Sequence, residues 1–87
     1  MSGAHDPNYI EFIAHLRNAR KAKNLSQKEL GELVNKPQSF VSKVETCERR
    51  LDVIEAAEWC VALGLRLEDT LPLSVKKALE DAAGKGQ

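Results

Sequence analysis

The stretch from Asn35 to Glu45, NKPQSFVSKVE, concentrates side chains that hydrogen-bond to polar partners. In a helix each residue turns by about 100°, so the polar members lie opposite Val41 and Val44. Those polar members are Ser39, Ser42 and Lys43, joined by Thr46 directly after the stretch, with Gln38 in the exposed first turn. Such a face suits the major groove of duplex DNA, because an amide pairs with adenine, an ammonium with guanine and a hydroxyl with either. We therefore predict that Gln38 contacts a base; the competing interpretation of the face is idle solvated surface.

Two short helices are expected to carry this face. Ser26 and Glu29 have the spacing of a capping box, which starts a helix of about two turns. Asn35 tolerates the left-handed turn that follows, and Pro37 suits the first turn of the next helix, residues 37–46. Two short helices joined by about three residues form a helix-turn-helix.

Helical signals also cover the rest of the chain. The expected elements are a helix from Pro7 to about Lys23, one from Val53 to about Leu63, a short element at 67–71 and a last helix at 75–82 capped by Ser74. A second capping-box-like pair, Asp52 and Glu55, starts the helix at Val53, and Gly64 ends it. With no strand signal of any length, the pattern predicts an all-α fold, a compact bundle of five or six short helices. We expect a short N-terminal arm (1–6), a helix-turn-helix domain (7–72), and a C-terminal helix with a disordered tail (73–87).

Composition and charge narrow the class of protein. The 87 residues allow one small domain, and their net charge is zero. Residues 17–50 nevertheless carry nine Lys or Arg against four Glu, a net of +5, while residues 1–16 carry −2 and residues 51–87 carry −3. A basic middle third fits a nucleic-acid face, although most local charge imbalance is only solvated surface. No apolar run reaches the roughly 20 residues of a membrane span, and the N-terminus lacks signal-peptide features, so we expect a cytoplasmic protein.

Catalysis and metal binding find little support in the chain. No nucleophile has a plausible base, no carboxylates cluster, and no glycine-rich phosphate loop is present. Cys47 and Cys60 show no metal-ligand pattern and are expected to be free thiols, and His5 and His15 lie too far apart to suggest a metal site. We therefore expect no enzyme activity, no cofactor and no metal.

The residues from Leu16 to Leu71 resemble the lambda-repressor-like, Cro/Xre family of helix-turn-helix regulators. The matching motifs are Leu25-Ser26-Gln27, Glu29-Leu30-Gly31, Val41-Ser42-Lys43-Val44-Glu45 and Ala62-Leu63-Gly64. Departures are Lys36 and Pro37 at the start of the second helix, and Cys47 at a position where the family usually has glycine. A left-handed Cys47 would carry about 1 kcal/mol of strain.

The resemblance implies a transcriptional regulator that binds specific double-stranded DNA, and we expect a repressor that binds an inverted-repeat operator as a homodimer. It also implies that Arg20 pairs with Glu45 inside the domain and that phosphates pass near Arg49 and Arg50, one of which is expected to contact them. Free N–H groups at the start of the first helix of the helix-turn-helix, which begins near Gln27, favour a phosphate at that residue. The expected DNA-binding residues are Gln27, Gln38, Ser39, Phe40, Ser42, Lys43, Arg49 and Arg50. For Phe40, packing at the core edge and contact with a thymine methyl remain equally open.

The apolar residues after Gly64 raise the question of a dimer. Leu65, Leu67 and Leu71 are expected to close the core, while Leu73, Val75 and Leu79 exceed what one small core covers. The excess indicates that the outer face of helix 53–63 and segment 67–79 together form a two-fold interface with a second copy, unless the last helix folds back over its own chain. Two other functions stay open: an antitoxin that binds a toxin protein and its own operator, and a protein-interaction domain that no longer binds DNA.

Overall fold

The computed structural model describes residues 6–85, apart from the side chains of residues 79 and 83–85. The elements in order are α1 (Pro7–Ala22), α2 (Gln27–Val34), α3 (Gln38–Glu45), α4 (Val53–Leu63), the 3₁₀ helix η2 (Leu67–Thr70) and α5 (Leu73–Lys85). No strand occurs within residues 6–85, and the predicted all-α fold with a helix-turn-helix is confirmed. Within the same residues, no helix is long and apolar enough to cross a membrane.

Local sequence signals set the ends of α2 and α4. Ser26 Oγ accepts a hydrogen bond from Glu29 N at 3.0 Å, and Glu29 Oε1 accepts one from Ser26 N at 2.8 Å, so the predicted capping box is present. Asp52 and Glu55 form the same reciprocal pair at the start of α4. The two helices end at the left-handed residues Asn35 (φ 63°) and Gly64 (φ 69°), as the sequence predicts.

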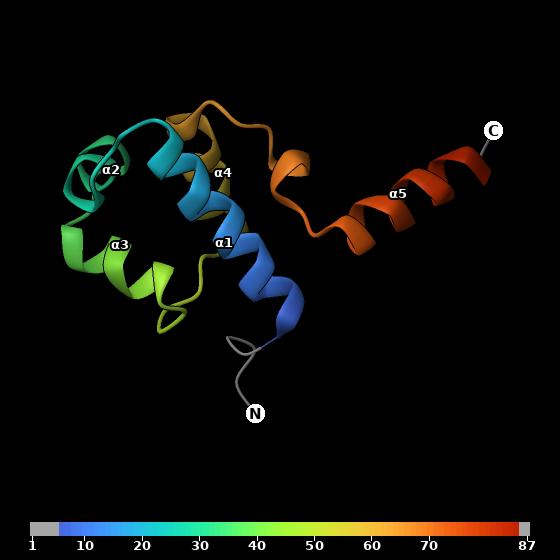
Figure 1. Cartoon of the computed structure of the whole chain (residues 1–87), viewed down its shortest axis with the longest axis horizontal. Helices are drawn as coiled ribbons and strands as arrows, with labels where there is room; N and C mark the ends of the chain where they lie inside the picture. Colours follow the sequence, from blue (N-terminus) through green and yellow to red (C-terminus); the bar gives the residue numbers. More distant parts are fainter. Residues whose placement is uncertain (1–5, 86–87) are drawn as a thin grey trace.

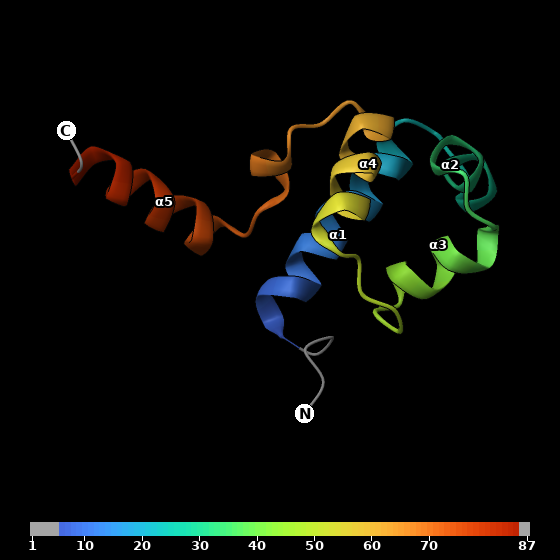
Figure 2. The ribbon, with the colours of Figure 1, turned by 180° about the vertical axis from the view of Figure 1, so that it is seen from behind.

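The core lies where α1, α2, α3 and α4 meet. Figures 1 and 2 show α1 and α4 running beside each other, with α2 and α3 packed to one side of the pair. The largest fully buried side chains come from all four helices and from η2: Leu16, Leu30, Val41, Val44, Trp59, Leu63 and Thr70. Burial of this apolar surface is the main stabilising term, and it fixes α3 against the rest of the domain.

The last helix differs from its prediction. It begins at Leu73, two residues before the predicted Val75, so Ser74 lies inside the helix and does not cap it. The Pro72 carbonyl accepts from Lys76 N at 2.9 Å, which closes the first turn earlier than Ser74 would. The helix also continues to Lys85, past its predicted end at residue 82 and into the predicted disordered tail, and residues 86–87 lie outside the described range. In both views α5 leads away from the other helices (Figures 1 and 2).

The segment between α4 and α5 closes the core differently from the prediction. Leu65 packs against the core and Leu71 is half-buried, but Leu67 is exposed, so its predicted role in closing the core is wrong. Thr70 is buried at this position instead, because its Oγ1 donates to the Leu67 carbonyl at 2.6 Å and its own carbonyl hydrogen-bonds His15 Nδ1 at 2.8 Å. The polar Thr70 is thus tolerated inside because both of its oxygen atoms have partners.

Candidate nucleic-acid interface

A close backbone approach holds α2 and α3 at a fixed angle. Lys36 N donates to the Gly31 carbonyl at 2.8 Å, and a Cβ atom on Gly31 would lie only 2.6 Å from the Lys36 carbonyl oxygen. Only glycine therefore fits at position 31 without a shift of the turn. The turn between the helices presents α3 as part of a rigid unit.

A buried ion pair ties the end of α3 to α1. Arg20 Nε donates to Glu45 Oε2 at 2.7 Å, Arg20 Nη2 donates to Glu45 Oε1 at 2.9 Å, and Arg20 Nη1 donates to the Leu25 carbonyl at 2.7 Å. The structural pairing that the resemblance implied is confirmed. Gln27 joins the same cluster, because its Nε2 donates to Glu45 Oε1 at 3.0 Å. The predicted phosphate contact by Gln27 would therefore come from an amide that an internal hydrogen bond already orients.

The polar face of α3 is open to solvent in its first turn and again at Lys43. Gln38, Ser39 and Lys43 are exposed, and Ser42 is half-buried. Pro37 is the N-cap of α3 and makes no side-chain hydrogen bond to the first turn, in contrast to the capped starts of α2 and α4. The structure thus places these predicted readers together on one accessible face. Their contact with DNA remains a prediction.

Phe40 lies at the border between this face and the core. Its half-buried ring packs edge-on against Trp59, with ring centroids 6.4 Å apart. The Arg49 guanidinium carbon lies 4.6 Å from the Phe40 centroid, and Lys36 Nζ lies 5.4 Å from it. Of the two roles left open for Phe40, packing at the core edge is the one that the structure supports.

The loop after α3 places its two arginines in different surroundings. Arg49 donates to both carboxylate oxygens of Glu55, at 2.8 and 3.1 Å, and to the Arg50 carbonyl at 2.6 Å. The Glu55 hydrogen bonds raise the pKa of Arg49, and the same bonds, with a smaller contribution from Asp52 N–H, lower the pKa of Glu55. Arg50 instead stacks on the Tyr9 ring, 4.2 Å from its centroid. Within residues 6–85 no carboxylate pairs with Arg50.

Two of these contacts escaped the sequence analysis. Glu55 was identified only as a capping residue, and nothing in the spacing from Arg49 to Glu55 indicates that the loop brings them together. The bond from Gln27 to Glu45 likewise joins residues 18 positions apart.

Cys47 does adopt the left-handed conformation considered for it, with φ 63°. Cys47 and Cys60 are both free thiols, as predicted, and burial raises the pKa of Cys60.

Comparisons with known proteins agree with this geometry. A helix-turn-helix family model matches residues 16–69, more than half of the chain, and the chain belongs to this family of Xre and lambda-repressor-like proteins. Such a protein is a DNA-binding transcriptional regulator.

Solved structures give the same result. An XRE-family like protein from Pseudomonas syringae pv. tomato str. DC3000 superposes with a TM-score of 0.73 at 41% identity, covering 86% of this chain and 89% of that one. The restriction-modification controller protein C.AhdI from Aeromonas hydrophila superposes with a TM-score of 0.69 at 28% identity, covering 77% of this chain and 97% of that one. No curated protein matches the chain.

Proposed function

We propose that the protein represses transcription in the cytoplasm by binding an inverted-repeat operator as a homodimer, with α3 of each copy in the major groove. It acts by occupying DNA and excluding polymerase, without catalysis. The observation that carries the proposal is the accessible polar face at the start of α3. Residues in the N-terminal turn of such a helix make most base contacts in helix-turn-helix proteins.

The surroundings of α3 support this orientation. Gln38 offers an amide donor and acceptor for adenine, and Lys43 offers an ammonium for guanine, both from exposed positions. Because α3 is held by the Gly31 approach and by the bond from Arg20 to Glu45, it would enter the groove as a rigid element. Rigid positioning favours specificity, because less conformational freedom is lost when the contacts form.

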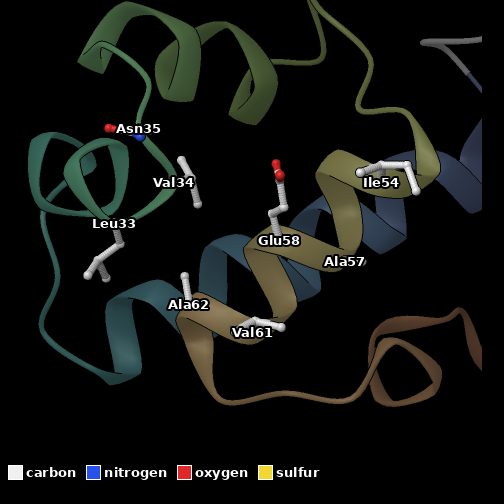
Figure 3. Close-up of a pocket in the computed structure, with 8 residues that line it drawn as sticks. All are labelled: Leu33, Val34, Asn35, Ile54, Ala57, Glu58, Val61 and Ala62. Carbon is white, nitrogen blue, oxygen red and sulfur yellow. The ribbon is translucent and has the colours of Figure 1, made fainter.

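Exposed apolar surface supports a dimer away from the DNA face. Figure 3 shows a groove between the end of α2 and α4, with Leu33 on one side and Ile54 and Val61 on the other. The Val61 side chain is 81% exposed, and Leu73 at the start of α5 is exposed as well. Apolar patches of this kind commonly mark interfaces. We propose that the outer face of α4 and the segment 67–79 pair with a second copy, which places two recognition helices about 34 Å apart, one turn of B-DNA.

The experiment for DNA reading is selection of binding sites from a library of random duplexes. We expect a two-fold symmetric site whose half-sites lie one helical turn apart. Gln38→Ala should then weaken binding to the selected duplex by about 1–3 kcal/mol and relax the preference at one base pair in each half-site. Asn18→Ala is the matched control, because Asn18 is an exposed amide on α1. If Gln38→Ala binds as tightly and as selectively as the parent protein, Gln38 is not a reader.

The dimer is tested by sedimentation at tens of micromolar protein. Val61→Asp should shift the protein toward monomer, whereas Ile10→Asp, which places the same charge at an exposed apolar site on α1, should not. A truncation after Leu71, which lacks α5, should also weaken the dimer. A parent protein that sediments as a monomer and binds one chain per site would contradict the proposal.

The similarity to C.AhdI favours the role of a restriction-modification controller among the roles that a repressor can have. That protein is a restriction-modification controller, and 97% of its chain is covered by the superposition. Inspection of the neighbouring genes tests the assignment: restriction and methyltransferase genes would support a controller role, and a toxin gene would favour the antitoxin alternative.

A further inference from the structure

The loop arginine Arg49 makes contacts that do not suit a phosphate ligand. Its guanidinium forms a two-bond fork with the Glu55 carboxylate at 2.8 and 3.1 Å and a third bond with the Arg50 carbonyl at 2.6 Å. The guanidinium also lies over the ring of Phe40, with Cζ 4.6 Å from the centroid. One side chain thus joins α3, the loop and the start of α4.

These contacts continue into the core and toward the reading face. The Phe40 ring packs edge-on against the buried Trp59 of α4, and Phe40 directly follows Gln38 and Ser39 in the first turn of α3. Glu55 is itself fixed, because its Oε1 also accepts from Asp52 N at 3.0 Å. Arg49 therefore connects Phe40, in the first turn of α3, to the Glu55 carboxylate, and that carboxylate is already held by the cap of α4.

We propose that Arg49 is a positioning residue for DNA reading: its fork to Glu55 and its stacking on Phe40 fix the orientation of the first turn of α3. Arg50 then supplies the phosphate contact of this loop. The proposal rests on the proposed function, since it concerns how the α3 face is held when it reads DNA. It distinguishes the two arginines, which sequence reasoning treated alike.

The physical basis is the geometry of arginine. A planar guanidinium forms two parallel hydrogen bonds to a carboxylate and stacks on an aromatic ring at the same time, which a lysine ammonium cannot do. The Arg49 side chain is 45% exposed, so the charge attraction alone contributes little. The function of the contact is therefore orientation, and its loss should affect selectivity more than overall affinity.

The test compares four variants on the selected duplex and on a scrambled duplex over a series of salt concentrations. Arg49→Ala, Arg49→Lys and Glu55→Gln should each reduce the preference for the selected duplex by about 5- to 20-fold, the scale of one loosened base contact. Their salt slope should stay parental. Arg50→Ala, the matched control, should weaken both duplexes alike and reduce the slope by about 0.9, the value for one phosphate contact.

Two results would overturn the proposal. If Arg49 is a phosphate ligand, Arg49→Lys keeps the parental preference while Arg49→Ala reduces the salt slope. Release of Arg49 by Glu55→Gln would in that case strengthen binding to both duplexes. Glutamine also serves as the reaching residue of a capping box, so Glu55→Gln preserves the α4 cap. The effect of this variant therefore reports the lost contact with Arg49 and not a lost helix cap.

A measurement without DNA separates this proposal from the proposed function. Urea unfolding, followed by the fluorescence of the single tryptophan Trp59, measures the free energy of unfolding of Phe40→Leu, Arg49→Ala and the double variant. We expect the stability losses of the two single variants not to add up to the loss of the double variant. Additive losses would mean that Arg49 does not hold Phe40. If the parent protein discriminates no duplex, the proposed function fails, while the unfolding cycle still decides whether the two side chains are coupled.

Discussion

Replacement of Glu45 by alanine should destabilise the domain more than any exposed charge substitution. The Arg20 and Glu45 side chains are only 9% and 3% exposed, so water does not replace the lost partner. Glu45→Ala leaves two Arg20 donors and the Gln27 amide donor without the acceptors that they have at 2.7, 2.9 and 3.0 Å. Breaking a buried pair from one side costs about 3–5 kcal/mol.

That loss is large against the whole stability of the domain. At about 0.05–0.15 kcal/mol per residue, a chain of 87 residues is stable by roughly 4–13 kcal/mol. Urea unfolding followed by Trp59 fluorescence measures the change directly. With a slope of about 1–2 kcal/mol per molar urea, the midpoint should fall by about 1.5 M or more.

Glu68→Ala provides the matched control. Glu68 pairs with Arg66 at 3.1 Å, but these side chains are 61% and 73% exposed. An exposed pair contributes about 0–1 kcal/mol, so this variant should unfold almost as the parent does. The double variant Arg20→Met/Glu45→Leu should recover most of the loss, because no buried charge is left unpaired. A Glu45→Ala loss no larger than that of Glu68→Ala would refute the reasoning.

Three further outcomes follow from the structure. Gly31→Ala should cost about 1–3 kcal/mol in urea unfolding, because its Cβ would lie 2.6 Å from the Lys36 carbonyl oxygen; an unchanged midpoint would mean that the turn relaxes freely. Because the folded-state pKa of Glu55 is lowered, its stabilisation is present above the unfolded pKa of about 4.3 and is lost as pH falls through the folded value. Glu55→Gln should therefore reduce the acid-induced drop in melting temperature, and a parental drop would exclude this carboxylate as a cause. A thiol reagent should modify Cys47 in the native protein but Cys60 only after unfolding, since Cys60 is buried and burial raises its pKa; equal rates in native protein would contradict the packing.

The elements that sequence reasoning predicted well are those set by local chemistry. The capping pairs at Ser26 and Asp52 and the left-handed ends at Asn35 and Gly64 depend on residues a few positions apart, so their patterns are visible in the chain. Helical periodicity likewise identified Val41 and Val44 as the buried side of α3 and Gln38 and Ser39 as its outward side.

The contacts that sequence reasoning missed depend on the path of a loop. The bond between Arg49 and Glu55 forms only because the loop from α3 folds back beside the start of α4. The exposure of Leu67 depends on Thr70 taking the inward position of η2, which two hydrogen bonds stabilise. No periodicity links such residues, and the start of α5 at Leu73 likewise depends on the Pro72 carbonyl.

The most direct test of the account is dimethyl sulfate footprinting of the protein on its selected duplex. The reagent methylates guanine N7, which lies in the major groove, the groove that α3 is proposed to enter. The account predicts protection in two symmetric clusters whose centres lie about 10–10.5 base pairs apart, one for each α3 of the dimer. A single protected cluster, or no N7 protection on a guanine-containing site that the protein demonstrably occupies, would contradict it.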